Sequence, residues 1–237
     1  MSSIRAVLFD LDDTLWPIVP VIQRAEKLLY AWLKLHAAPV TERVTIESMR
    51  ERRQQLMASD PVYQRDLRIL RRTVLLEAFA DAGLDTRLVD EAMEVFSKAR
   101  NEVTPFADVL PALENLRSRV MLGSVSNGVA DLDAIGIAHY FQASVAAHRI
   151  GCAKPDAAIF HAACDALGVA PAETLYVGDD PLLDVEGAQK AGLRAAWINR
   201  VEIGQDRVLP SHVTPDAVFG NLHQLEQWLK DNDPLTR

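Results

Sequence analysis

Cysteine is scarce in this chain, with only Cys152 and Cys164 among 237 residues. Two cysteines exclude the disulfide framework of a small secreted domain and a cysteine-rich zinc cluster. The six histidines show no spacing typical of metal ligands. The scarcity of cysteine favours a protein of a reducing, cytoplasmic compartment.

Long apolar runs are also missing. No stretch approaches the ~20 apolar residues that cross a bilayer. The segment from Met1 to Phe9 lacks the apolar core of a secretory signal and runs directly into charged residues. We therefore expect a cytoplasmic protein with no membrane partner.

Positive charge is in deficit, because 25 Lys and Arg residues face 33 Asp and Glu residues and leave a net charge of −8. Phosphate backbones reward clustered positive charge. The balance therefore argues against a nucleic-acid partner, whereas an anionic substrate remains compatible if positive charge is local.

Apolar residues make up 49% of the chain, enough for one large domain or for a core domain that carries a smaller one. From residue 119 onward, short apolar runs alternate with helical patterns, which indicates parallel strands joined by helical crossovers. The fold class predicted is α/β, with a three-layer, Rossmann-like core around a parallel sheet. The expected strands are 4–10, 120–125, 141–147, 174–177 and 194–198, and the helices between them are 132–137, 157–167 and 185–191.

The segment 17–103 differs from the rest because it has little strand signal and long amphipathic stretches at helical spacing. We expect it to form an inserted α-helical bundle, or cap domain, with the catalytic core domain at 1–16 and 104–237. Ligands of open parallel sheets lie outside the carboxyl ends of the strands, where such an insertion would form a lid. The four predicted cap helices are 21–35, 44–57, 63–82 and 88–100.

Two carboxylates, Asp10 and Asp12, follow directly on the apolar run 6–9. If the extended geometry persists, both side chains project to one side of the strand, with Cα atoms roughly 6.6 Å apart. At an effective dielectric constant of about 20, two unit charges at that separation repel by roughly 2 to 3 kcal/mol. Because proteins seldom tolerate this without a metal, a basic group or a bound proton, the pair predicts a cation.

Polar residues also follow later strands. Ser126, Asn127 and Gly128 come after the strand 120–125 and suit either phosphoryl oxygens or an ordinary turn. Lys154 stands before Pro155, and its two interpretations are a site cation and a solvated surface charge.

A second acidic group follows the strand 174–177. Asp179 and Asp180 come directly after Gly178, and Asp184 stands one helical turn further on. These carboxylates suit a metal site or an acidic helix start, and the second interpretation is stronger for Asp180 than for Asp179.

Together these residues resemble the haloacid dehalogenase superfamily of phosphohydrolases, and its four motifs occur in the family's order. The matching positions are Asp10 to Thr14, Ser126 with Asn127, Lys154 with Pro155, and Gly178 to Asp184. The resemblance covers the core nearly end to end. It points to the branch with a helical cap after the first motif, although the cap matches only in position and helical character.

The resemblance implies a Mg²⁺-dependent phosphomonoester hydrolase that acts on a small phosphorylated metabolite. The residue matching Asp10 is the nucleophile, which forms an aspartyl-phosphate. The residue matching Asp12 is the general acid and base.

The resemblance also implies a division of labour around the phosphoryl group. Mg²⁺ would be held by the Asp10 carboxylate, the Asp12 backbone carbonyl and the Asp179 carboxylate, with Asp184 in support. The residues that would bind the transferring phosphoryl group are Ser126, Asn127 and Lys154.

Other functions on the same fold are a phosphomutase, a halocarboxylate dehalogenase and a non-catalytic binding protein. The dehalogenase branch needs no metal and lacks the acid that matches Asp12. Decay toward a non-catalytic protein would first remove residues such as Asp10, Lys154 or Asp179, and all are present.

Several features stay open. We assign no role to Asp13, and Asp180 either tightens metal binding or faces solvent. Trp16 lines a leaving-group pocket or packs in the core. The oligomeric state is a monomer or a homodimer. The cap arginines Arg65, Arg68 and Arg72 share one helix face, which either reaches a second anionic group or is solvated and salt-bridged.

Overall fold

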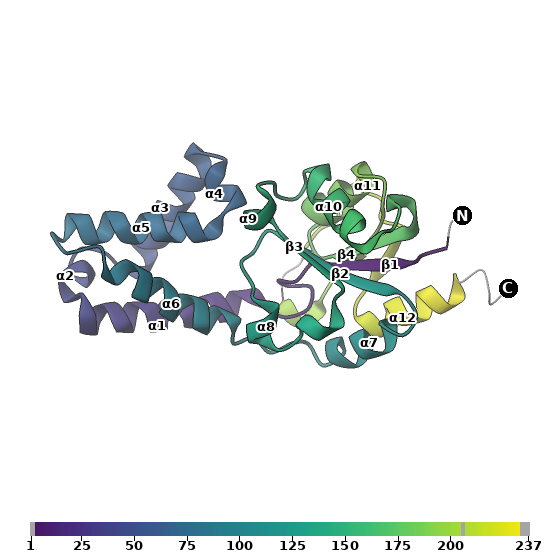
Figure 1. Cartoon of the computed structure of the whole chain (residues 1–237), viewed down its shortest axis with the longest axis horizontal. Helices are drawn as coiled ribbons and strands as arrows, with labels where there is room; N and C mark the ends of the chain where they lie inside the picture. The colour runs from purple at the N-terminus through teal and green to yellow at the C-terminus, as the bar shows by residue number, and fades with distance from the viewer. Residues whose placement is uncertain (1–2, 205–206, 233–237) are drawn as a thin grey trace. The chain divides into compact units, whose positions relative to one another are not determined.

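The computed structural model describes residues 3–204 and 207–232 (Figure 1). The chain clusters into two compact units. The core unit holds the chain up to Pro17, Thr104–Gly128 and everything from Gly136 onward, and the helical unit holds Ile18–Val103 and Val129–Ile135.

The core unit is built on a parallel sheet of six strands within the described residues, in the order β3-β2-β1-β4-β5-β6 (Figure 1). This sheet confirms the predicted α/β class. The sixth strand was not predicted, because its three residues carry too short a pattern to distinguish a strand from a loop. The strands are β1 (Ala6–Phe9), β2 (Met121–Ser126), β3 (Ala143–Ala146), β4 (Thr174–Gly178), β5 (Arg194–Ile198) and β6 (Ala217–Phe219).

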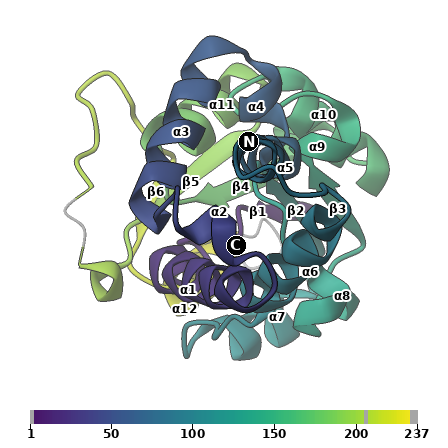
Figure 2. The same cartoon turned by 90° about the vertical axis from the view of Figure 1, so that its left-hand side faces the viewer.

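Helices cover both faces of this sheet. In Figures 1 and 2, α10 (Ala157–Leu167) and α11 (Gly187–Lys190) lie on one face, and α7 (Val109–Leu116) and α12 (Leu222–Asp231) lie on the other. Every residue of β1 and of β4 is buried, as expected for parallel strands covered on two sides. The remaining helical segments of the core unit are α9 (Ala147–Ile150), the π-helix η3 (Pro181–Glu186), and the 3₁₀ turns Ala138–Tyr140, Pro171–Glu173 and Val201–Ile203.

An apolar core lies between the sheet and the helices α10 and α11, and alternate residues of the central strands contribute side chains to it. The aromatic side chains of Phe160 and Tyr176 meet edge to face there, with ring centroids 5.0 Å apart. Such pairs add about 0.5–1.5 kcal/mol beyond their buried area. The cluster joins strand residues to α10 and α11, and it includes Leu8, Val125, Val145, Tyr176, Ala195, Trp197, Ile159, Phe160, Ala163 and Ala188.

The helical unit is a bundle in which α1 packs along α6, and α5 packs against α3 and α6 (Figures 1 and 2). Its apolar core contains Leu29, Leu33, Val74, Phe79 and Phe96. None of the described helices combines the length and the apolar character that a membrane crossing requires. The helices are α1 (Ile18–His36), α2 (Ala38–Thr41), α3 (Ile46–Ser59), α4 (Val62–Arg65), α5 (Leu67–Asp81), α6 (Leu88–Asn101) and α8 (Leu132–Ile135).

One predicted helix of this unit is wrong. The stretch 63–82 is not continuous, because α4 ends at Arg65 and Asp66 begins a new helix. The Asp66 carboxylate accepts hydrogen bonds from the backbone N–H groups of Arg68, at 2.8 Å, and Ile69, at 3.0 Å. An aspartate that satisfies two free N–H groups is a strong N-cap.

The second difference concerns residues 129–135, which the sequence analysis assigned to the core. They cluster with the helical unit, where α8 packs against α6. The backbone N–H of Asp131 donates to the Asn101 side chain at 3.1 Å. Because this contact joins residues 30 positions apart, no local pattern could indicate it.

Candidate active site

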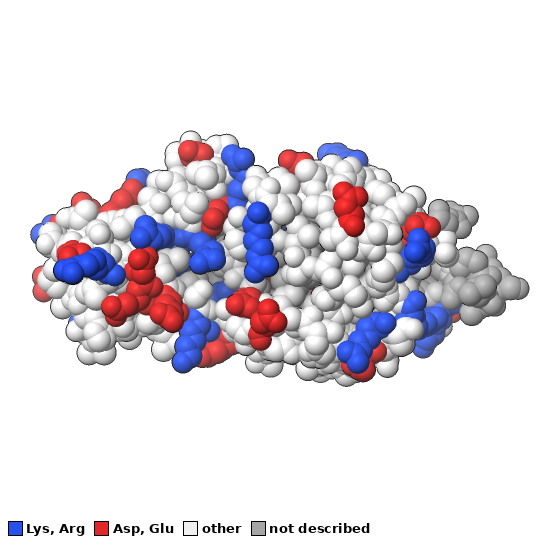
Figure 3. Space-filling view, in the orientation of Figure 1, with Lys and Arg blue, Asp and Glu red and all other residues white. Residues whose placement is uncertain are grey.

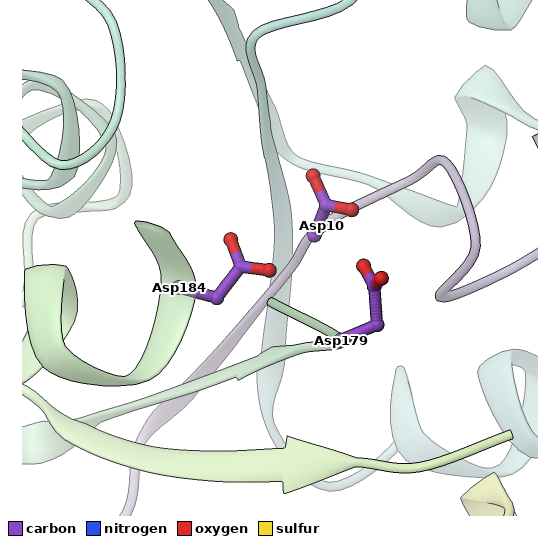
Figure 4. A group of neighbouring side chains, drawn as sticks. All are labelled: Asp10, Asp179 and Asp184. Carbon is purple, nitrogen blue, oxygen red and sulfur yellow. The ribbon is translucent and has the colours of Figure 1, made fainter. Parts of the chain in front are cut away.

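Three buried carboxylates meet at the carboxyl end of the sheet: those of Asp10, Asp179 and Asp184 (Figure 4). Asp10 follows β1 and Asp179 follows β4. These strands are paired, with Phe9 beside Val177, so the two aspartates leave the sheet side by side. Asp184 comes from η3, and one carboxylate oxygen from each of the three lies within 4.8 Å of the others. Their predicted proximity therefore follows from the strand order.

Lys154 supplies a cation to this cluster. It is 6% exposed, and its Nζ donates to Asp10 Oδ1 at 2.5 Å, to Asp184 Oδ1 at 2.6 Å and to the Tyr176 hydroxyl at 3.0 Å. The Tyr176 hydroxyl in turn donates to the Val125 carbonyl at 3.1 Å. Lys154 is thus a buried site residue, and the solvated-surface interpretation is wrong.

Burial dominates the protonation of these groups. Burial raises the pKa of Asp10 to about 7, with Asp184 and Asp12 adding to the rise and Lys154 opposing it. Burial opposes the charged form of Lys154, but the carboxylates of Asp10 and Asp184 outweigh it, so the pKa of Lys154 lies well above its usual value. The cluster therefore holds a lysine that is charged at neutral pH and a carboxyl group with a raised pKa.

The loop after β1 turns sharply and directs Asp12. Asp13 adopts a positive φ of 63°, which aspartate tolerates better than most residues. The backbone N–H of Asp13 donates to the Trp16 carbonyl at 2.8 Å, and the Trp16 indole Nε1 donates to Asp12 Oδ1 at 2.8 Å. Trp16 is 0% exposed, so of its two interpretations the structure selects core packing, with the added task of holding the Asp12 carboxylate.

Ser126 is the last residue of β2 and Asn127 follows it, and the side chains of both already have partners. Ser126 Oγ accepts from the Gly128 N–H at 2.9 Å. The Asn127 amide accepts from the Lys154 N–H at 2.8 Å and donates to the Lys154 carbonyl at 3.0 Å. Asn127 therefore positions the main chain that carries Lys154, a role the motif alone did not reveal.

Asp179 is held from three sides. The Thr14 hydroxyl donates to its Oδ1 at 3.2 Å, the Trp197 indole donates to its backbone carbonyl at 2.8 Å, and Arg207 forms an ion pair with its other carboxylate oxygen. Arg207 also pairs with Asp13 at 2.9 Å, which gives Asp13 a partner. No local pattern marked Arg207, because it lies in the loop between β5 and β6, far from the motifs in sequence.

Asp180 is a helix cap. Its carboxylate accepts from the N–H groups of Leu182, at 2.8 Å, and Leu183, at 2.9 Å, at the start of η3. Its own N–H donates to Asp184 Oδ2 at 2.9 Å. The helix-start interpretation of Asp180 is therefore correct, whereas Asp184 is turned into the cluster by Lys154 and this N–H. Gly178 leaves room for that arrangement, since a Cβ atom on it would lie 2.6 Å from the Asp184 Cβ.

Arg200 braces the loop that follows β1, and sequence reasoning assigned it no role. It is 2% exposed, and its guanidinium donates to the Thr14 carbonyl at 3.1 Å and to Asp108 Oδ1 at 2.7 Å. The other Asp108 oxygen accepts from the Leu222 N–H at 2.6 Å. A buried arginine between two segments distant in sequence fixes their relative position.

The donor set fits a hard divalent cation. Mg²⁺ prefers carboxylate and carbonyl oxygens, and the cluster of Asp10, Asp179 and Asp184 offers three carboxylates within reach of one ion. Two cationic side chains, Lys154 and Arg207, are drawn onto the same carboxylates. The carboxylates thus attract positive charge, which is what the pair Asp10 and Asp12 predicts from the sequence.

The comparisons with known proteins agree with this geometry. The family model of haloacid dehalogenase-like hydrolases matches residues 4–192. The 5-amino-6-(5-phospho-D-ribitylamino)uracil phosphatase YigB of Escherichia coli (strain K12) is 30% identical over 84% of either chain. The phosphoserine phosphatase of Thermus thermophilus is 34% identical over 65% of this chain and 63% of its own.

A solved structure named 2-haloacid dehalogenase, from Pseudomonas syringae pv. tomato DC3000, is 39% identical. It covers 96% of this chain and 99% of its own, with a TM-score of 0.88. Relatives with different printed activities therefore share the fold. The family match spans well over half of the sequence and contains all four motif positions, so the chain belongs to the haloacid dehalogenase-like hydrolases.

Proposed function

We propose that this hydrolase is a Mg²⁺-dependent phosphatase that cleaves a phosphomonoester of a small metabolite through an aspartyl-phosphate on Asp10. The proposal rests on the position of Asp12, which stands two residues after the proposed nucleophile Asp10. The Trp16 indole holds the Asp12 carboxylate in place through a hydrogen bond. A leaving alkoxide needs a proton, and Asp12 is placed to give it. The printed names of the curated relatives support a phosphatase.

The proposed reaction has two displacements at phosphorus. Lys154 holds Asp10 Oδ1, so we assign the attack to Asp10 Oδ2. A bond from this oxygen to phosphorus forms as the ester P–O bond breaks, and Asp12 protonates the departing oxygen. Asp12 then takes a proton from the water that attacks the aspartyl-phosphate, which releases inorganic phosphate and restores both carboxyl groups.

Mg²⁺ would be held by the Asp10 carboxylate, the Asp12 backbone carbonyl and the Asp179 carboxylate, with Asp184 in support. When bound, the ion supplies positive charge that screens the phosphoryl oxygens. A phosphate dianion and the Asp10 carboxylate bring about −3, which Mg²⁺ and Lys154 offset by about +3. Ser126, Asn127 and Lys154 are the proposed phosphoryl-binding residues, with Asn127 acting chiefly through its hold on Lys154.

We further propose that residues 17–103 serve as the cap that sets substrate choice, and that the protein is cytoplasmic. Cys152 and Cys164 do not form a disulfide with each other, as expected in a reducing compartment. The relatives' printed substrates differ widely at about 30% identity, so none of them is assigned to this chain.

Dehalogenation is the second candidate, because the 39% identical structure bears that name. An aspartate that displaces halide from carbon forms an ester without protonating the leaving group, since halide is already a stable anion. Asp12 would then have no leaving group to protonate. The two functions therefore differ in what Asp12 must do.

The deciding experiment measures phosphate release from an aryl phosphate with Mg²⁺ and halide release from a 2-halocarboxylate, for wild type, Asp10→Asn and Asp12→Asn. A phosphatase releases phosphate only, and Asp12→Asn lowers its rate by about 10²–10⁴-fold. Halide release that survives Asp12→Asn, without phosphate release, would establish the dehalogenase instead. If wild type and Asp10→Asn are equally inert on a broad phosphate panel, the phosphatase proposal fails.

A further inference from the structure

The helical unit contains a buried charge cluster of its own. Glu26 of α1 is 3% exposed and faces three arginines, Arg50 and Arg53 of α3 and Arg71 of α5. Arg50 donates to Glu26 Oε2 through Nε at 2.7 Å and Nη2 at 2.5 Å, and Arg53 donates to Oε1. Arg71 Nη1 lies 4.0 Å from the same Oε1, beyond hydrogen-bond distance.

The charges in this cluster do not balance. One carboxylate meets three guanidinium groups, which leaves a local excess of two positive charges. Glu47 also interacts with Arg50, whose side chain is 41% exposed and partly solvated. Arg53 and Arg71 have side chains only 14% and 12% exposed, so they share Glu26 with little help from water.

Arg71 carries the clearest sign of a missing partner. Within the part of the chain that the structure describes, its buried Nη1 has no hydrogen-bond acceptor. Its guanidinium stacks on the Phe96 ring, 3.4 Å from the centroid, which satisfies the face of the group but not its in-plane N–H donors. Burial, with the nearby charge of Arg53, lowers the pKa of Arg71 to about 9, which still leaves it protonated at neutral pH.

The charge imbalance and the Arg71 N–H donor, which has no acceptor in the described part of the chain, indicate an anion site only in combination, as a comparison with Arg200 shows. Arg200 in the core unit also has a buried Nη2 without an acceptor among the described residues, but Asp108 matches its charge one to one. An ion pair of that kind is complete as a structural brace. Three arginines around one carboxylate do not form such a complete pair. Uncompensated buried charge lowers the stability of the fold by several kcal/mol unless a counter-ion is present.

We propose that Arg53 and Arg71, with Arg50 at the more exposed side, bind a compact oxyanion, a carboxylate or a phosphoryl group, inside the helical unit. A planar guanidinium fork matches the two oxygens of such a group, and one anion would relieve most of the charge excess. This site does not depend on the proposed phosphatase activity, and its occupant is either a free anion or an anionic group of a larger molecule.

The neighbouring arginines provide matched controls. Arg52 directly precedes Arg53 in the sequence, and Arg72 directly follows Arg71. Unlike Arg53 and Arg71, both are exposed and each has its own acidic partner. Arg52 donates to both oxygens of Glu77 at 2.8 Å, and Arg72 pairs with Asp90 at 3.1 Å. Figure 3 shows Lys or Arg side chains adjoining Asp or Glu side chains on the surface of the helical unit. Of the two interpretations given for Arg72, this contact favours the solvated one.

The test titrates inorganic phosphate into the full chain with a metal chelator present and chloride at matched ionic strength. The arginine Nε–Hε signals in ¹H–¹⁵N NMR spectra, assigned with single Arg→Lys variants, report the site directly. We expect saturable shifts of the Arg53 and Arg71 signals. Arg71→Met should weaken phosphate binding at least about tenfold, whereas Arg72→Met should leave it unchanged.

A gain-of-function variant separates a binding site from a structural ion cluster. Glu26→Gln removes the carboxylate that competes for the arginines, so it should tighten phosphate binding by about tenfold. Phosphate should then raise the Tm of the Glu26→Gln variant more than it raises the Tm of wild type. Shifts no larger than chloride produces, or equal binding by Arg71→Met and Arg72→Met, would overturn the proposal. Should Arg71→Met fail to fold, the wild-type NMR shifts decide alone.

A second measurement identifies the source of the anion. KM is compared for an aryl phosphate with no charged group besides the phosphate and for a phosphomonoester that also carries a carboxylate, in wild type and Arg71→Met. A rise in KM confined to the carboxylated substrate assigns the site to the substrate, and unchanged KM values with lost phosphate binding assign it to a free anion. Absence of any turnover would contradict the phosphatase proposal only, because the phosphate titration stands independently.

Discussion

The two units bury charge in opposite senses. In the core unit, the carboxylates of Asp10, Asp179 and Asp184 pair with Lys154 and Arg207, so three acids meet two bases. In the helical unit, three arginines share Glu26, so bases exceed acids. Such imbalances destabilise a folded chain unless a group of opposite charge joins them or, as the raised pKa of Asp10 allows, a proton is taken up. The two binding proposals rest on the sign of each imbalance: we propose a cation for the core unit and an anion for the helical unit.

The largest expected effect concerns the acidic cluster. Asp10→Asn removes the nucleophilic carboxylate while nearly keeping the side-chain size, so aryl phosphate hydrolysis should fall at least about 10³-fold. Steady-state kinetics with Mg²⁺ measure this loss. The exposed Asp165→Asn on α10 is the matched control and should retain full activity.

In the arginine cluster of the helical unit, substitution of its single acid, Glu26, should lower the stability of the fold the most. Glu26→Gln leaves three guanidinium groups around a neutral side chain, and breaking a buried pair in this way costs about 3–5 kcal/mol. Arg71→Met reduces the imbalance and should cost far less. Urea unfolding of both variants in phosphate-free buffer compares them, and a larger loss for Arg71→Met would contradict the charge excess inferred from the geometry.

Metal affinity tests the acidic cluster without turnover. Asp179→Asn should weaken Mg²⁺ binding, measured by calorimetry, by about 10–100-fold. Asp180→Asn, its neighbour in sequence, alters only a helix cap and should leave Mg²⁺ affinity intact at a stability cost of at most about 1 kcal/mol. Equal effects of the two variants on affinity would show that the site does not distinguish these carboxylates.

A balanced pair should behave differently from either cluster. Burial raises the pKa of Asp108, but the Arg200 guanidinium and the Leu222 N–H outweigh it, so the net pKa is lowered from 3.8. A lowered folded-state pKa means that the pair stabilises the fold above pH 3.8 and that this contribution fades as the pH falls further. Urea unfolding at pH 3 and pH 5 should show a smaller pH dependence in Asp108→Asn than in wild type.

Strand-end residues were the most predictable part of the site. Asp10, Ser126 and Asp179 each end an apolar run, and parallel strands bring their carboxyl ends to one edge. Lys154 lies on no strand, and only the resemblance to a known family brought it into the site. The predicted metal and phosphoryl-binding roles stay predictions.

Contacts across long sequence separations could not be predicted. Arg200 and Arg207 come from the chain after β5, and their partners Asp108 and Asp13 lie 92 and 194 positions earlier. Helical spacing also grouped Arg65, Arg68 and Arg72 as one face without showing which face of the bundle points inward. The arginine of α5 that reaches Glu26 and Phe96 in the bundle is instead Arg71, one residue before Arg72.

Gly178 offers a way to separate distance from charge in the acidic cluster. A methyl group at this position would meet the Asp184 side chain, so Gly178→Ala must push that carboxylate aside. The substitution adds no titratable group and removes none, so the net charge of the protein is unchanged. Whatever Gly178→Ala does to metal affinity or proton uptake would therefore measure the placement of one carboxylate, independently of its presence.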